Sequence, residues 1–144
     1  MKIARLRTDS GIVWAVRHSE SHFTLLEGNP LDQFQDTGRE VSGHLLAPLV
    51  PPTIYCIGLN YREHAEETGK PVPEFPVVFL KSPTALLDPL APIRLPNPAV
   101  TETVDYEAEL AVIIGKDCRN VSRANAFDVI LGYTCANDVS ARNW

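Results

Sequence analysis

The sequence has no long apolar stretch, no clustered cysteines and no run of basic residues. A membrane-spanning helix needs about 20 consecutive apolar residues, and no segment of the 144 residues approaches that length. Residues 1–11 carry basic side chains without an apolar segment after them, so we expect no secretory signal peptide. These absences predict a cytoplasmic protein with no membrane partner.

The cysteines and the charges exclude two further classes of protein. Cys56, Cys118 and Cys135 are far apart and form no C-x-x-C pair, which favours reduced thiols over disulfides or a zinc site. The net charge of −5 is spread along the chain. Nucleic-acid-binding domains usually carry a patch of lysine and arginine, so we expect no nucleic-acid partner.

The composition that remains is that of a globular protein, with 44% hydrophobic residues. Residues 2–7, 12–16 and 23–26 resemble short strands separated by turn residues. The proline-rich segment P-L-V-P-P at residues 48–52 interrupts regular structure. We therefore predict a small β-rich segment at residues 1–50 and a main domain at residues 51–144. The three histidines of the first segment, His18, His22 and His44, are expected to be solvated.

The second half alternates strand-like and helical segments. Strands are predicted at 53–58, 76–81, 105–115 and 129–136, and helices at 60–68 and 122–128, the last with Ser122 as its N-cap. The predicted fold class is therefore mainly β, within the α+β group.

The motif Y-E-A-E-L-A-V-I-I-G at residues 106–115 places two carboxylates before an apolar run. Side chains alternate faces along a strand, so Glu107 and Glu109 should point the same way, about 7 Å apart, with Asp105 on that face too. Neighbouring carboxylates need a cation or a proton, and oxygen ligands favour Mg²⁺, Mn²⁺ or Ca²⁺. A solvated acidic edge strand would give the same pattern.

Two further motifs contain candidate site residues. Asp138 follows an apolar run and could supply a third carboxylate, and Arg142 could hold an anionic substrate through paired hydrogen bonds. His64 and Glu67 lie three positions apart on a predicted helix, where a carboxylate can orient the imidazole for proton transfer. Lys81 ends an apolar strand and could hold a substrate carboxylate. Each motif also fits an ordinary turn or a surface helix.

Taken together, the motifs resemble the fumarylacetoacetate hydrolase family. They occur in the order G-L-N-Y-x-x-H-A-x-E, V-x-F-L-K, Y-E-x-E-L-A-V-I-I-G and N-D-V-S-A-R, from about residue 53 to residue 144. The resemblance implies a β-roll core, often dimeric, in a chain that continues beyond residue 144. The present chain is therefore expected to be incomplete, with unpaired strand edges and exposed apolar faces.

The resemblance also assigns roles to the candidate residues. It implies a divalent metal, Mg²⁺ before Mn²⁺ or Ca²⁺, held by Glu107, Glu109 and Asp138. It implies a water-activating dyad of His64 and Glu67, with Lys81 lining the site. The expected reaction is metal-dependent cleavage of a carbon–carbon bond in acylpyruvate-like or hydroxy-dienoate diacids through an enolate.

Several alternatives remain open from the sequence. The same fold supports isomerases and decarboxylases, such as those acting on 2-hydroxyhepta-2,4-diene-1,7-dioate in aromatic catabolism. A non-catalytic fragment and a structural β-protein with solvated carboxylates are the two non-enzymatic alternatives.

Overall fold

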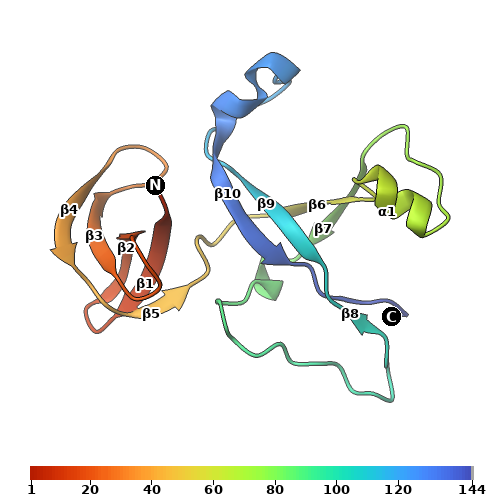
Figure 1. Ribbon diagram of the computed structural model, residues 1–144, viewed down its shortest axis with the longest axis horizontal. Coiled ribbons are helices and arrows are strands. Elements are labelled where there is room, and N and C mark those ends of the chain that lie inside the picture. Colours follow the sequence, from red (N-terminus) through yellow and green to blue (C-terminus); the bar gives the residue numbers. More distant parts are fainter. Residues whose placement is uncertain (144) are drawn as a thin grey trace. The chain divides into compact units, whose positions relative to one another are not determined.

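The structure is a computed structural model that describes residues 1–143 (Figure 1). It is mainly β, as predicted. The chain forms two compact units, Met1–Leu26 with Asp36–Ala91, and Glu27–Gln35 with Pro92–Trp144. The predicted boundary near residue 50 stays a prediction. No helix within the described residues is long and apolar enough to cross a membrane.

The N-terminal part forms a five-stranded antiparallel sheet in the order β4-β3-β2-β1-β5 (Figure 1). The strands are β1 (Ile3–Thr8), β2 (Gly11–Arg17), β3 (Phe23–Gly28), β4 (Phe34–Glu40) and β5 (His44–Leu46). The three predicted strands are confirmed within two residues at each end. The sequence did not reveal β4, which is almost entirely polar, or β5, which is only three residues long. Both depend on pairing with neighbours rather than on an apolar pattern.

The core of this sheet is small. Ala4, Leu6, Ala15 and Phe23 are buried together, and Leu6 is 0% exposed. Alternation along β1 places Ala4 and Leu6 on the same face, so the sheet buries one side as an antiparallel sheet can. This packing, rather than the polar β4, stabilises the N-terminal part.

The next elements are β6 (Ile54–Gly58), α1 (Arg62–Glu67) and β7 (Val77–Lys81), followed by the 3₁₀ turn η1 (Pro83–Ala85). The two strands pair antiparallel from Ile54 opposite Lys81 to Gly58 opposite Val77. Both strands and the helix were predicted from the sequence. Leu59 joins β6 to the segment before α1 with a φ of 49°, in the left-handed region that bulky residues rarely adopt.

The last part of the chain contains two antiparallel strand pairs. They are β8 (Val104–Asp105) with β11 (Ser140–Ala141), and β9 (Ala108–Ile114) with β10 (Ile130–Asn137). The prediction of one continuous strand at residues 105–115 was therefore wrong. The strand is interrupted between Asp105 and Ala108 because its two parts pair with different strands, β8 with β11 and β9 with β10. Asp138 and Val139 separate β10 from β11 in the same way.

The segment before β10 also differs from the prediction. Residues Arg123–Val129 form a 3₁₀ helix, η2, and Ser122 precedes it without a capping side-chain hydrogen bond. The predicted helix is thus confirmed in place, as a 3₁₀ helix, whereas the predicted side-chain cap by Ser122 was wrong. The pair β9–β10 exposes large apolar side chains, among them Leu110, Val112 and Ile114, which are 58%, 45% and 54% exposed. Exposed apolar faces were expected from the family resemblance.

Candidate metal centre

Glu107 and Asp138 come from separate parts of the chain and meet through their backbones. The backbone N–H of Asp138 donates to the carbonyl oxygen of Glu107 over 3.0 Å. In return, the side-chain oxygen Oδ1 of Asn137 accepts the backbone N–H of Glu107 over 3.2 Å. Two of the three predicted metal ligands are therefore neighbours. The sequence motif N-D contained Asn137, but nothing in the sequence showed that its amide would hold Glu107.

Glu109 lies close to the same place along the backbone. In the pairing of β9 with β10 it is directly opposite Ala136, two residues before Asp138. Glu107, Glu109 and Ala111 are all partly buried, whereas Ala108 and Leu110 between them are exposed. This alternation is typical of a strand with one covered face. The backbone thus gathers Glu107, Glu109 and Asp138 at one end of β9 and β10.

Arg142 binds two carboxylates through different nitrogen atoms. Its Nε donates to Oδ2 of Asp105 over 3.0 Å, and its Nη2 donates to Oε1 of Glu107. The backbone N–H of Arg142 also donates to the carbonyl oxygen of Thr103 over 2.8 Å, which fixes the residue beside β8. The hydrogen bond to Glu107 is the main cause that raises the pKa of Arg142, followed by the one to Asp105.

The three carboxylates fit a hard divalent ion by their chemistry and backbone positions. Oxygen-only ligands suit Mg²⁺, Mn²⁺ or Ca²⁺. In the part of the chain that the structure describes, no three His, Cys, Asp or Glu side chains converge closely enough to hold an ion. The carboxylate of Glu107 is instead directed to Arg142. An ion bound at Oε1 of Glu107 would have to displace the guanidinium, and the metal set stays a prediction.

The predicted dyad lies on α1. His64 and Glu67 are both within this six-residue helix, and the carbonyl oxygen of His64 accepts both the N–H and the hydroxyl of Thr68. Among the described residues, no ion pair joins His64 to Glu67. Lys81 is the last residue of β7, opposite Ile54. The roles of these three residues stay predictions.

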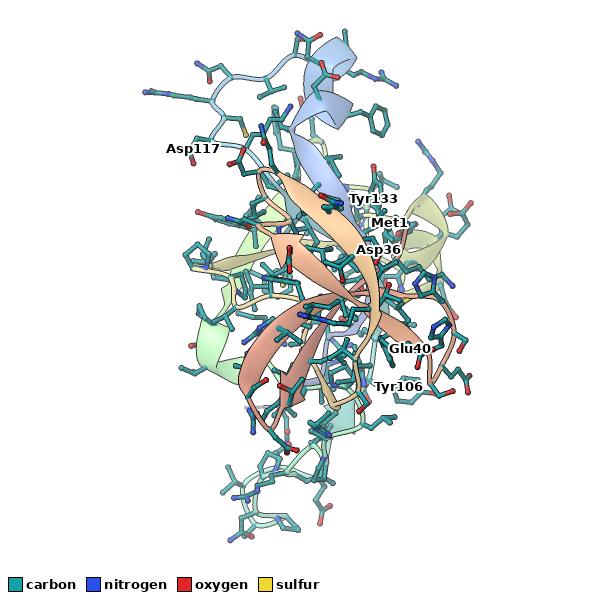
Figure 2. The ribbon with its side chains drawn as sticks, turned by 90° about the vertical axis from the view of Figure 1, so that its left-hand side faces the viewer. Met1, Asp36, Glu40, Tyr106, Asp117 and Tyr133 are labelled. Carbon is teal, nitrogen blue, oxygen red and sulfur yellow. The ribbon has the colours of Figure 1, made fainter. Side chains whose placement is uncertain are left out.

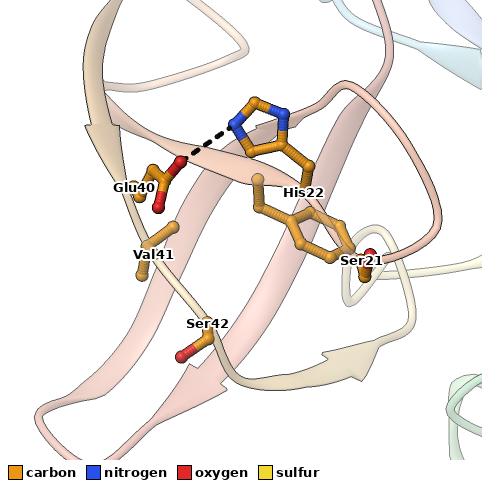
Figure 3. A pocket seen from close by; sticks show the side chains of 6 residues that line it. Ser21, His22, Glu40, Val41 and Ser42 are labelled. Atoms are coloured by element: carbon orange, nitrogen blue, oxygen red, sulfur yellow. Dashed lines mark ion pairs between the residues drawn. The ribbon is translucent and has the colours of Figure 1, made fainter.

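A second polar cluster lies in the N-terminal sheet. Nε2 of His22 is 3.5 Å from Oε1 of Glu40. Both side chains line one pocket (Figure 3). His18 is hydrogen-bonded to the hydroxyl of Thr24 over 2.7 Å and lies 3.9 Å from Asp36. Asp36 and Glu40 both come from β4 (Figure 2). The histidines are exposed, as predicted, but they have polar partners that the sequence did not reveal.

Comparison with known proteins identifies the family. Residues 53–144 match the family model described as fumarylacetoacetate (FAA) hydrolase C-terminal. The chain belongs to the fumarylacetoacetate hydrolase family. Residues 1–48 match a second model, described as Rv2993c-like, N-terminal. The mainly β fold is thus that of the family, preceded by a segment with relatives of its own.

Members of the fumarylacetoacetate hydrolase family similar to this chain have different named activities. Oxaloacetate tautomerase fahd2 of Xenopus laevis is 46% identical over 101 residues, which is 69% of this chain and 31% of the relative. Caffeoylpyruvate hydrolase of Neonothopanus nambi is 47% identical over 93 residues, which is 62% of this chain and 32% of the relative. The family therefore includes hydrolases and isomerases.

A solved structure extends the likeness over nearly the whole chain. The 2-hydroxyhepta-2,4-diene-1,7-dioate isomerase of Mycobacterium marinum is 37% identical with a TM-score of 0.83, covering 99% of this chain and 55% of that one. The chain spans between 31% and 57% of the lengths of the curated relatives it matches. The activity of a whole protein of this family is for that reason a proposal here.

Proposed function

We propose that the complete protein is a metal-dependent enzyme that hydrolyses a carbon–carbon bond in a small acylpyruvate-like acid. The observation that carries the proposal is that the backbones of Glu107, Glu109 and Asp138 lie at the adjoining ends of β9 and β10. If their side chains turn toward one another, the carboxylates would repel one another and lose hydration unless a cation neutralised them. The named substrates of the relatives, oxaloacetate and caffeoylpyruvate, support oxo-acids as the substrate class.

We propose Mg²⁺ as the preferred divalent ion. Held by these carboxylates, it would act as a Lewis acid on the substrate oxygens and stabilise negative charge that develops there. The residues of the chain have separate tasks in this proposal. Arg142 and Lys81 would bind the carboxylate of the substrate. His64, oriented by Glu67, would accept a proton from water, whose hydroxyl adds to the distal carbonyl carbon. The bond from that carbon to the neighbouring carbon then breaks, its electron pair passes to the leaving fragment, and the leaving carbon gains a proton.

Isomerisation is a second candidate, favoured by one observation. The solved structure of the isomerase of Mycobacterium marinum is 37% identical over 99% of the chain, whereas that of the fumarylacetoacetate hydrolase of Exiguobacterium antarcticum is 30% identical over the same share. In an isomerase or tautomerase, the dyad would move a proton between positions of the substrate and no water would be consumed. A decarboxylase would use the same carboxylate cluster. We propose a homodimer for each, which size-exclusion chromatography tests.

The experiment that tests the function uses the complete protein. It is freed of metal with a chelator, then assayed with and without Mg²⁺ on acylpyruvates, oxaloacetate and hydroxy-dienoate diacids. Release of pyruvate and a carboxylic acid from an acylpyruvate, without carbon dioxide, identifies hydrolysis. Release of carbon dioxide, with pyruvate when the substrate is oxaloacetate, identifies decarboxylation. A change in ultraviolet absorbance without any of these products identifies isomerisation. Turnover that chelation does not affect would contradict the proposed metal centre.

Variants assign the roles within that experiment. Glu107→Gln and Asp138→Asn should abolish Mg²⁺-dependent turnover, while Glu102→Gln, an exposed acidic residue before β8, should not. His64→Ala should slow hydrolysis but keep Mg²⁺ binding. Normal hydrolysis by His64→Ala would remove the dyad from the mechanism. No turnover, together with a melting temperature that Mg²⁺ does not shift, would favour a non-catalytic or structural protein, since a ligand of the folded state stabilises it.

A further inference from the structure

Glu107 takes part in two arrangements that exclude each other. Its Oε1 accepts a hydrogen bond from Arg142, yet the proposed function requires the same carboxylate to bind an ion. A guanidinium and a divalent ion compete for Oε1, because two positive charges at one oxygen repel each other. An ion that takes Oε1 must displace the guanidinium from it.

Arg142 is held in a way that allows one contact to break alone. The contact to Asp105 uses Nε, and the contact to Glu107 uses Nη2. The backbone of Arg142 is fixed separately by its hydrogen bond to Thr103. A turn of the Glu107 side chain therefore removes one hydrogen bond and leaves the other two in place.

We propose that Arg142 is an internal counter-cation that occupies Glu107 until a divalent ion binds. The inference rests on the proposed function and adds an order of events to it. When the ion takes Glu107, Arg142 keeps its contact with Asp105, and its Nη donors become free for an anionic group of the substrate. The ion thus binds before the substrate carboxylate can be held by Arg142.

The exposure of the pair supports an exchange of this kind. The side chains of Arg142, Asp105 and Glu107 are 48%, 57% and 27% exposed, so water screens the attraction between them. Exposed ion pairs contribute little to stability. Arg142 relieves the repulsion between Asp105 and Glu107 while no ion is bound. Its weak hold on Glu107 permits a divalent ion to displace it.

Calorimetric titration of the complete, metal-free protein with Mg²⁺ tests the competition. Arg142→Gln removes the guanidinium, so Mg²⁺ should bind more tightly, by up to about fivefold, the range set by an exposed ion pair. Arg119→Gln is the matched control, because Arg119 is exposed in the loop after β9 and makes no side-chain ion pair within the described residues. It should leave the affinity unchanged. Equal or weaker binding by Arg142→Gln would overturn the proposal.

A second measurement separates displacement from a general effect of charge. In the ¹⁵N-labelled protein, saturating Mg²⁺ should speed hydrogen exchange at Nη of Arg142 while Nε–H stays protected by Asp105. Glu107→Ala, which removes the accepting oxygen, should reproduce the state with Mg²⁺ bound. Arg142 signals that do not respond to saturating Mg²⁺ would overturn the proposal, because a charge acting from a distance predicts no change in either hydrogen bond.

The outcomes distinguish this inference from the proposed function. If Mg²⁺ binds wild type and Arg142→Gln equally, Arg142 does not compete, and the metal-dependent enzyme stands. If neither protein binds Mg²⁺, both proposals are wrong. Binding that is detectable only in Arg142→Gln would support both.

Discussion

The side-chain oxygen Oδ1 of Asn137 accepts the backbone N–H of Glu107 over 3.2 Å. The two residues are thirty positions apart, and the bond lies where the chain passes from β8 to β9. Glu107 has no partner in the β9–β10 ladder, which begins at Ala108 opposite Asn137. The side chain of Asn137 therefore accepts the backbone N–H of Glu107, which has no partner in the strand ladder. The bond also orients the backbone of a proposed metal ligand.

Replacing Asn137 should weaken metal binding without touching a ligand. Asn137→Ala leaves the backbone N–H of Glu107 unpaired, so we expect Mg²⁺ to bind the complete protein severalfold more weakly, as happens when groups that orient a ligand are removed. Titration calorimetry measures the affinity. Asn137→Asp, which keeps the accepting oxygen, should recover most of it, and Asn125→Ala in η2 should have no effect. Unchanged affinity in Asn137→Ala would show that the bond does not position Glu107.

The sequence predicted the residues of this site better than their arrangement. Alternation and spacing correctly identified the apolar strands β6, β7 and β10 and the short helix α1. They failed at Tyr106 and Glu107, where the acidic motif resembles an unbroken strand. The break depends on which partner strand pairs with each half, β11 or β10, and such long-range pairing has no local signature.

The hydrogen-bond partners of the side chains could not be predicted from the sequence either. Arg142 was assigned to a substrate from its residue type, but its contacts with Asp105 and Glu107 join positions 37 and 35 residues away. The polar strand β4 was missed because its burial is slight and its role is to pair with β3. Local patterns report on local structure, whereas these features arise when distant segments pack.

The N-terminal sheet should depend on one fully buried side chain. Leu6 is 0% exposed, and Leu6→Ala removes its packing and leaves a cavity. We expect a loss of about 2–5 kcal/mol in the free energy of unfolding. Ile12→Ala on β2 is the matched control, because Ile12 is 53% exposed, and its effect should stay within about 0.5 kcal/mol. Urea denaturation followed by tryptophan fluorescence measures both. Equal losses would show that the sheet has no specific core at Leu6.

Asp36 should make the stability of the same sheet depend on acid. The backbone N–H of Gly38, which donates to Oδ1 of Asp36 over 3.0 Å, is the main cause that lowers the pKa of Asp36 below its ordinary value of 3.8. Thr24 and His18 lower it further. Because the folded pKa is depressed, the stabilisation is present above pH 3.8 and disappears as the pH falls through the folded value.

Melting temperatures at a series of pH values test this dependence. Wild type should melt above Asp36→Asn at pH 5 to 7, and the difference should shrink below about pH 4 as the carboxyl group is protonated. Asp9→Asn, in the turn between β1 and β2, serves as the control and should show no such trend. A difference that stays constant down to pH 2.5 would mean that the charge of Asp36 does not stabilise the sheet.

The left-handed backbone of Leu59 should reverse the usual order of two substitutions. At most positions glycine is less stable than alanine by about 0.5–1 kcal/mol, because it loses more conformational freedom on folding. At a φ of 49° a side chain with a Cβ is strained, by about 1–2 kcal/mol. The complete protein with Leu59→Gly should therefore be more stable to urea than the one with Leu59→Ala, by up to about 1 kcal/mol.

The neighbouring strand supplies the matched pair for this comparison. Ile57 lies in β6, two residues before Leu59, and has no positive φ. Ile57→Gly should be less stable than Ile57→Ala, the ordinary order. If Leu59→Gly is also the less stable of its pair, the turn relaxes out of the left-handed region in solution.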